Sequence, residues 1–205
     1  FEMICNEVTD SNGLAIRVDD DRYSDWDSFS AYWKQAGSLI TSASGLGITS
    51  DDATADMLVA NDLGVDVDII ASGGSGDNVT FLLNGTTDFL MGNVSEMVAA
   101  HNDGQFKILC VFAEERDSNL PDVPTYEELT GNLVVGCSSR GYAMLKDVPD
   151  DIKQILGDAV KAAVQDPDLI EQLNAIYTTT DYKEGQEYVD YMNQQQQQAR
   201  ETWGV

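Results

Sequence analysis

The sequence predicts an α/β fold in which helices flank a parallel sheet. The first reason is a repeated order of strand, loop and helix across residues 14–112. The second is size, because 205 residues, 42% of them hydrophobic, can bury a core in one large domain or two small ones. The third is a rigid connector with two prolines at 120–125, after which the pattern changes.

The expected strands are short apolar runs bounded by glycine, acidic or other turn-forming residues. Residues 65–71, for example, alternate apolar and acidic side chains before they become apolar, and a glycine loop follows. In the first part of the chain the expected strands are 1–5, 14–18, 39–42, 65–71, 88–91 and 106–112. In the second part they are 133–137, 142–145 and 176–180.

The expected helices follow capping residues. Ser24 or Asp25 precedes aromatic residues at helical spacing, and Gly37 ends that helix. Ser50 or Asp51 caps the next one. The expected helices of the first part are 24–35, 50–61, 77–83 with Asp77 as its cap, and 94–101. In the second part helices begin at 148–151 and 166–167, and a terminal helix covers 184–203.

The charge of the chain excludes several classes of partner. The formal net charge is -25, from 36 acidic and 11 basic residues. Nucleic-acid binding needs a basic footprint, and anionic membranes would repel this surface. No run of about eighteen apolar residues is present, so the sequence predicts no membrane-spanning helix. We interpret the acid excess as a solvated surface, which means that an anionic ligand must be held by local donors.

Neither a metal nor a cofactor is predicted. Cys5, Cys110 and Cys137 have no CxxC or Cys/His spacing, which argues against zinc. Cys5 and Cys137 could pair if the chain leaves the cell, and Cys110 lies in an apolar run typical of a core. The acidic cluster at 19–21 lacks the glycine that an EF-hand loop requires.

Signals of catalysis are few, and no catalytic residue is predicted. His101 is the only histidine, and it precedes a helix-ending turn. The sequence contains no GxSxG, HExxH or P-loop motif. A small α/β hydrolase with Ser44 or Ser75 as nucleophile is an alternative hypothesis, but it lacks a base.

Loops that join strands to helices form the candidate binding site. The loop 42–50 and the loop 72–76 both supply small residues and lead to helix N-termini, which favour an anion. The first loop lacks the third glycine of GxGxxG and any GK[ST], so a nucleotide is not indicated. In open α/β sheets ligands bind beyond the carboxyl ends of strands. The residues predicted to hold a carboxylate are Ser42, Ser44, Gly45, Gly47, Gly74, Ser75 and Asn93.

The order of the motifs resembles one family of proteins, the substrate-binding proteins of tripartite tricarboxylate transporters, also called Bug-type receptors. The most specific match is the Leu-Pro-Asp-Val-Pro-Thr connector at 120–125 with Glu128 after it. The other matches are a strand with a Gly/Ser loop at 39–47, Gly74-Ser75, the Leu-Leu-x-Gly-x-x-Asp turn at 82–88, Gly-x-x-Lys-x-Leu at 104–109, Ser-Arg-Gly at 139–141 and the Val-Pro helix start at 148–149. The resemblance covers nearly the whole chain in order.

This resemblance implies a periplasmic-binding-protein-like fold of type II, with two lobes, parallel or mixed sheets and a cleft. The lobes would be 18–117, and 1–17 together with 118–205. It implies capture of a small organic anion without catalysis and hand-over to the membrane subunits of a transporter. It also implies a periplasmic or extracellular location, with which membrane association as a lipoprotein is compatible.

Two departures from the family pattern bear on these expectations. Family members begin with a strand and a Gly-rich loop that this chain lacks, so its first lobe is expected to be incomplete. A second copy of the chain could cover the exposed faces, as a homodimer. Ser72 replaces an aromatic residue, and Gly92 replaces an acidic one. The alternative function is a truncated interaction or oligomerisation module that binds no small ligand.

Overall fold

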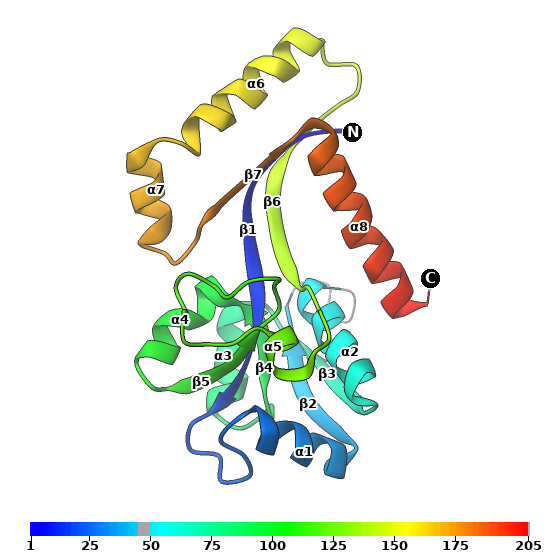
Figure 1. The fold of residues 1–205 in the computed structure, drawn as a ribbon, viewed down its shortest axis with the longest axis vertical. Helices are drawn as coiled ribbons and strands as arrows, with labels where there is room; N and C mark the ends of the chain where they lie inside the picture. The colour runs from blue at the N-terminus through cyan, green and yellow to red at the C-terminus, as the bar shows by residue number, and fades with distance from the viewer. Residues whose placement is uncertain (45–49, 205) are drawn as a thin grey trace. The chain divides into compact units, whose positions relative to one another are not determined.

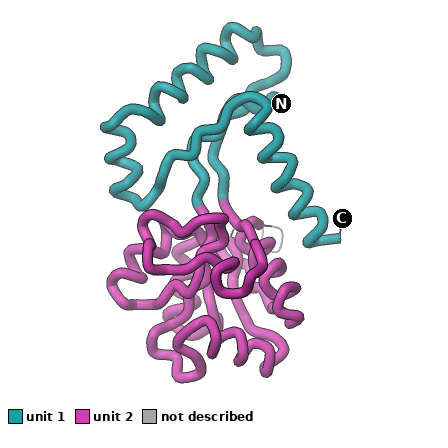
Figure 2. Tube along the Cα trace, in the orientation of Figure 1, with its two compact units in different colours: residues 1–10, 138–205 teal, residues 11–137 magenta. Residues whose placement is uncertain are grey.

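The computed structural model describes residues 1–44 and 50–204, and the chain divides into two compact units (Figure 2). The smaller unit is Phe1–Asp10 with Ser138–Val205, and the larger is Ser11–Cys137. The expected lobe of 18–117 lies wholly inside the larger unit, which also includes 11–17 and 118–137. Backbone hydrogen bonds explain why 11–17 and 118–137 belong to the larger unit. Asn12 N donates to Gly136 O at 2.8 Å, and Phe112 N donates to Asn12 O at 2.9 Å.

The sheets of the larger unit contain both strand orientations (Figure 1). The second half of β1 (Glu2–Arg17) lies between β4 (Leu90–Asn93) and β5 (Phe106–Val111) and is antiparallel to both. β2 (Ser38–Ala43) and β3 (Asp66–Ala71) form a parallel pair. The strand–helix repeat predicts this parallel pair. It does not predict that β1, which comes from the start of the chain, pairs in the opposite direction with β4 and β5.

Among the described helices of the larger unit, α1, α2 and α5 begin at a residue whose side chain accepts from a free backbone N–H group. They are α1 (Trp26–Ala36), α2 (Asp51–Leu63), α3 (Ser75–Leu83), α4 (Val94–Asn102) and α5 (Tyr126–Thr130). The Asp25 carboxylate accepts from Ser28 N at 2.9 Å, and Gly37 ends α1 with a φ of 83°. The expected start of α3 at Asp77 is wrong. Gly74 is the N-cap, and the Asp77 carboxylate accepts from Gly73 N at 3.0 Å.

Aromatic rings form the centre of the larger unit's core. The Phe29 and Trp33 rings of α1 are both fully buried. Phe29 packs edge-on against Phe89 with ring centroids 5.6 Å apart, and Trp26 meets Tyr126 of α5 at 5.2 Å. α5 is not among the expected helices. Its Thr125 cap and Glu128 exchange hydrogen bonds in a capping box.

The smaller unit is built around the first half of β1. β6 (Cys137–Met144) and β7 (Thr180–Glu184) pair with β1, and the helices are α6 (Asp150–Ala163), α7 (Pro167–Asn174) and α8 (Gly185–Trp203). The expected strand at 133–137 is wrong, since regular pairing starts only at Cys137. The expected strand at 176–180 is also displaced. Thr178 N donates to Leu173 O in a turn after α7, and Tyr177 has a φ of 57°.

The smaller unit has a thin apolar core. Cys5, Val160 and Val164 form its buried cluster, whereas Ile152 and Ile155 of α6 are 47% and 67% exposed. Among the described residues, Cys5, Cys110 and Cys137 form no disulfide, so Cys5 is not bonded to Cys137. Among the described residues no helix is both long and apolar enough to cross a membrane.

Candidate functional site

The first predicted loop leaves β2 beside a buried hydroxyl. Ser42 is fully buried, and its Oγ has no hydrogen-bond partner among the residues that the structure describes. Ser44 follows β2 and is partly buried. Gly45 and Gly47, which the sequence also predicts to bind, lie outside the described residues. The described part of this loop therefore offers the Ser44 hydroxyl and a buried Ser42 hydroxyl that carries no hydrogen bond.

A single carboxylate links β1 to the loop that follows β2. Asp52 lies in the first turn of α2 and is 5% exposed. It accepts from Ser44 Oγ at 2.9 Å and from Asn12 Nδ2, on β1, at 3.0 Å. The same Asn12 Nδ2 lies 3.5 Å from Oδ1 of Asn93, the last residue of β4. Two predicted site residues, Ser44 and Asn93, are thus brought together through Asn12 and Asp52.

Burial makes Asp52 unusual among the many carboxylates of the chain. Burial raises the pKa of the Asp52 carboxyl to about 6. The negative charge of Asp51 contributes to this rise in the pKa of Asp52, whereas the hydrogen bonds from Ser44 oppose it. Asp52 therefore changes its charge at a pH at which an exposed aspartate is fully ionised.

A second buried carboxyl lies one turn further along α2. Asp56 is fully buried, and neither of its carboxyl oxygens has a hydrogen-bond partner among the described residues. Burial, together with the charge of Asp52, raises the pKa of Asp56 well above its ordinary value. The protonated form of Asp56 is therefore favoured, because an unpaired charge is costly in such a place.

The second predicted loop lies next to the end of β2. Ser72 N donates to Ala43 O at 3.0 Å, and Ser72 Oγ lies 3.2 Å from the same oxygen. Gly74 is the N-cap of α3, and Ser75 is its first residue and half-buried. Because β2 and β3 are parallel neighbours, their carboxyl ends meet at one edge, and the two predicted loops are adjacent.

Asn12 and Asp52 are site residues that sequence reasoning misses. Asp52 has a weak signal, since it follows a Gly/Ser loop within the first turn of an expected helix. Asn12 has none, because an Asn-Gly pair between two apolar runs is more typical of a turn than of a continuous strand. Here Asn12 and Gly13 lie inside β1 and pair with β4.

The geometry gives the hydrolase alternative no support. A serine nucleophile needs an adjacent base, usually an imidazole. The side chain bonded to Ser44 is the Asp52 carboxylate. His101 instead accepts from Ile108 N through its Nδ1 at 3.2 Å, and burial lowers its pKa. Among the described residues no group of three or more His, Cys, Asp or Glu side chains is placed to hold a metal ion.

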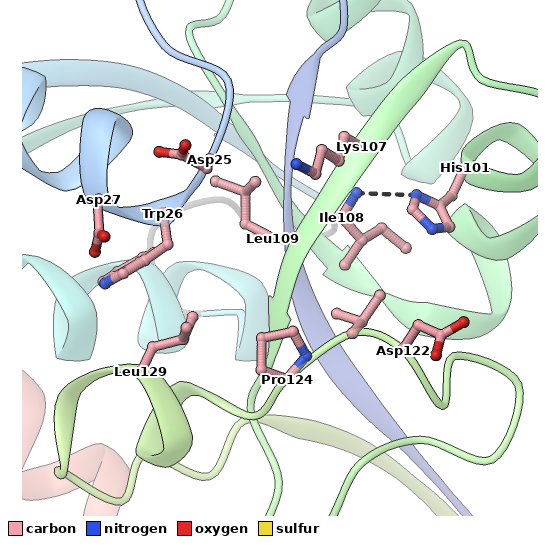
Figure 3. Close-up of a pocket in the computed structure, with 11 residues that line it drawn as sticks. Asp25, Trp26, Asp27, His101, Lys107, Ile108, Leu109, Asp122, Pro124 and Leu129 are labelled. Atoms are coloured by element: carbon pink, nitrogen blue, oxygen red, sulfur yellow. Dashed lines mark hydrogen bonds between the residues drawn. The ribbon is translucent and has the colours of Figure 1, made fainter.

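A separate pocket of about 490 Å³ lies in the larger unit beside α1 and β5 (Figure 3). Apolar side chains form much of its lining, and Asp25 and Asp27 stand on the α1 side, away from Lys107 and His101. The Lys107 ammonium donates to Ser24 O at 2.9 Å. None of the predicted binding residues that the structure describes lines this pocket, and its acidic side chains do not suit an anion.

Comparisons with known proteins agree with this architecture. A family model, the tripartite tricarboxylate transporter family receptor, matches residues 1–202. A protein of Agrobacterium vitis, the UPF0065 protein in the TAR-I ttuE-ttuC' intergenic region, is 28% identical over 147 residues, 71% of this chain but only 41% of that protein. This chain therefore spans less than half the length of that curated relative.

Several solved structures match the whole chain. A TctC solute binding protein from Polaromonas, with no ligand, is 24% identical with a TM-score of 0.82, covering 100% of this chain and 69% of that one. An R. palustris protein with adipate is 17% identical with a TM-score of 0.83, covering 100% and 69%. These similarities show a periplasmic-binding-protein fold of which this chain supplies a large part.

Proposed function

Because the chain belongs to the tripartite tricarboxylate transporter receptor family, we propose that it is a solute-binding protein that captures a small organic anion for a transporter of this type. The observation that carries the proposal is the meeting of β1, β2 and β4 at the N-terminus of α2. Asn12, Ser44 and Asn93 lie there, joined through Asp52. Ser44 and Asn93 stand at the carboxyl ends of β2 and β4, and strand ends of this kind are where open α/β sheets hold their ligands.

The ligand is held by neutral donors, since a chain of net charge -25 offers no attractive global field. α2 has 13 residues and α3 has 9, and their N-termini direct free N–H groups and a positive dipole end toward the two loops. Hydroxyl and amide side chains add directional hydrogen bonds. The proposed binding residues are Ser42, Ser44, Gly45, Gly47, Gly74, Ser75 and Asn93.

A carboxylate is the anion that fits these donors best. Two adjacent loops with backbone N–H groups and hydroxyls can each bind one carboxylate oxygen, and no metal or cofactor is needed. The adipate in a structurally similar protein makes dicarboxylates the first compounds to try. Binding is followed by hand-over to the membrane subunits, without catalysis, in the periplasm or outside the cell. Lipoprotein anchoring is compatible with this role.

A thermal-shift screen of the full chain against di- and tricarboxylates, aromatic acids and amino acids tests the proposal. A ligand that binds only the folded state raises the melting temperature by mass action. We expect a dicarboxylate to raise it, with a matched diamine of the same length as the negative control. Equal responses to the acid and the diamine, or none to any acid by calorimetry, would count against an anion receptor.

Exposed apolar side chains in the smaller unit favour a second candidate, an interaction module that self-associates. Ile152 and Ile155 of α6, and Ile176 beyond α7, are 47%, 67% and 60% exposed. Exposed apolar side chains such as Ile152 and Ile155, both on α6, are typical of a contact surface. Light scattering checks this candidate: a homodimer that becomes monomeric in Ile155→Glu supports it, and a monomeric wild type refutes it.

A further inference from the structure

We propose that Asp52 is a positioning residue of the anion site, and that binding of the anion is linked to uptake of one proton by its carboxyl group. This inference rests on the proposed function and deepens it. The inference explains how the anion site binds a negative ligand although the side chains around that site are neutral or negative.

The hydrogen bonds of Asp52 set which donors are available to a ligand. An ionised carboxylate only accepts, and here it accepts from Ser44 Oγ and from Asn12 Nδ2. The Ser44 hydroxyl, one of the proposed ligand donors, is therefore engaged with Asp52. When a proton binds Oδ2, the carboxyl becomes a donor at that oxygen, and the Ser44 hydroxyl is free to rotate toward an anion.

The charges around Asp52 make proton uptake favourable when an anion arrives. Asp51 of the same helix and Glu96 of α4 both act on Asp52 with negative charge, whereas Asp56, one turn further along, is neutral. The groups that meet there are Asn12 of β1, Ser44 after β2 and Asn93 of β4, and all three are neutral. An added anion would raise the repulsion, and one proton on Asp52 offsets it.

A helix-capping role alone does not account for Asp52. Acidic residues in a first turn favour the helix dipole, and exposed Asp51 already supplies this. Capping would not require that the carboxylate be 5% exposed and bonded to Asn12 of β1 as well as to Ser44 in the loop after β2. The cost of burying a titratable group at this place is instead consistent with a group that changes charge in use.

The linkage between anion binding and protonation of Asp52 predicts how strongly the affinity depends on pH. If only the protonated site binds, the apparent affinity falls by about tenfold for each pH unit above the pKa of Asp52. With that pKa at about 6, raising the pH from about 5 to about 7.5 should weaken binding by about thirtyfold. Near pH 7, binding should take up roughly 0.9 of a proton at Asp52.

The first test needs no ligand. In the full chain, NMR follows the Asp52 carboxyl carbon and the Asn12 side-chain amide between about pH 4 and 8. We expect both signals to shift with one common midpoint near that of the raised pKa. The Asn12 step should vanish in Asp52→Asn and persist in Asp21→Asn, an exposed control. The proposal would be overturned if the NMR signal of the Asn12 amide did not change with pH, or if the Asp52 carboxyl titrated like an exposed aspartate.

The second test separates the linkage from the receptor function. Calorimetry with adipate near pH 7, in two buffers of unlike ionisation enthalpy, counts the protons taken up. Subtracting the count for Asp52→Asn cancels the protonation of adipate itself. We expect wild type to exceed the variant by most of one proton. Equal counts with binding retained would refute the linkage and leave the receptor function intact. No adipate binding at any pH from about 5 to 7.5 would refute both for this ligand.

Discussion

The Asp52 carboxylate accepts a hydrogen bond from the side chain of Asn12 at 3.0 Å, across 40 positions of the sequence. Both residues are buried, so this contact fixes the N-terminus of α2 against β1 in a place that water reaches poorly. The strength of a hydrogen bond to an ionised group rises in such surroundings. Stability, pH dependence and binding should therefore all respond to changes at this pair.

Asn12→Ala should destabilise the chain by about 1–3 kcal/mol near pH 7, because it leaves a buried carboxylate short of a donor. Urea unfolding measures the change, and Asn102→Ala, at the exposed end of α4, serves as the control. Equal stability of the two variants would mean that the Asn12–Asp52 contact contributes nothing to folding.

The pH dependence of stability should carry the signature of Asp52. Its folded pKa of about 6 lies above the unfolded value. The folded state therefore binds more protons between these values, and its stability falls as the pH rises through them. A difference of roughly two units corresponds to about 3 kcal/mol as an upper bound.

Asp52→Asn removes this dependence. The variant should be more stable than wild type near pH 8, and the difference should shrink toward pH 4. Denaturant unfolding across this range measures the difference. A constant difference between the two proteins at all pH values would contradict the raised pKa.

Asp56 should be replaceable by an apolar residue without loss of stability. Both of its oxygens are buried and unpartnered among the described residues, so Asp56→Leu should stabilise the chain by about 1–3 kcal/mol near pH 7. Asp56→Asn should change little, because the native carboxyl is already neutral there. Destabilisation by the leucine would indicate that the Asp56 carboxyl has a partner in solution, such as an ordered water. Thermal unfolding of the three proteins provides the comparison.

Ser75→Ala should weaken binding of the dicarboxylate found in the screen by about two- to tenfold, the effect of losing one neutral hydrogen bond. Ser118→Ala, exposed and in the same unit, is the matched control. Calorimetry on both variants decides the matter. An unchanged affinity in Ser75→Ala would remove this residue from the proposed site.

Local signals made much of the fold predictable. The start and end of α1 follow from Asp25 and Gly37, since a side-chain cap and a left-handed glycine act within a few residues. Local signals do not predict that β1 continues as one strand through Asn12 and Gly13. Its Asn12-Gly13 pair is a turn signal locally, and only pairing with β4 and β5, about eighty or more residues away, keeps it extended.

The candidate site likewise contains residues that local signals predict and residues that depend on contacts between distant segments. Ser44, Gly74 and Asn93 can be proposed because each follows a strand and precedes a helix, which the sequence reveals. Asp52 is different, because its importance depends on its burial and on a partner from β1. Neither a burial fraction nor a contact between distant segments is encoded in a short motif. Sequence reasoning therefore finds the loops of the site and misses the carboxylate that joins the strands.

Gly141 should tolerate no side chain. A Cβ at this position of β6 would lie 2.5 Å from the Cys5 carbonyl oxygen, 2.6 Å from the Tyr188 hydroxyl and 3.0 Å from Asn6 Cα. Two of these atoms belong to the backbone of β1, so the strands must separate. Gly141→Ala should therefore cost more than about 2 kcal/mol, as overpacking of a filled site does.

Gly76→Ala is the matched control for this prediction. A Cβ at Gly76 meets nothing within 4 Å, and alanine favours the helix in which it lies. We expect Gly76→Ala to leave stability equal or slightly raised, while Gly141→Ala unfolds at a clearly lower urea concentration. If both alanine variants unfold together with wild type, β6 must pair with β1 more loosely than the structure indicates.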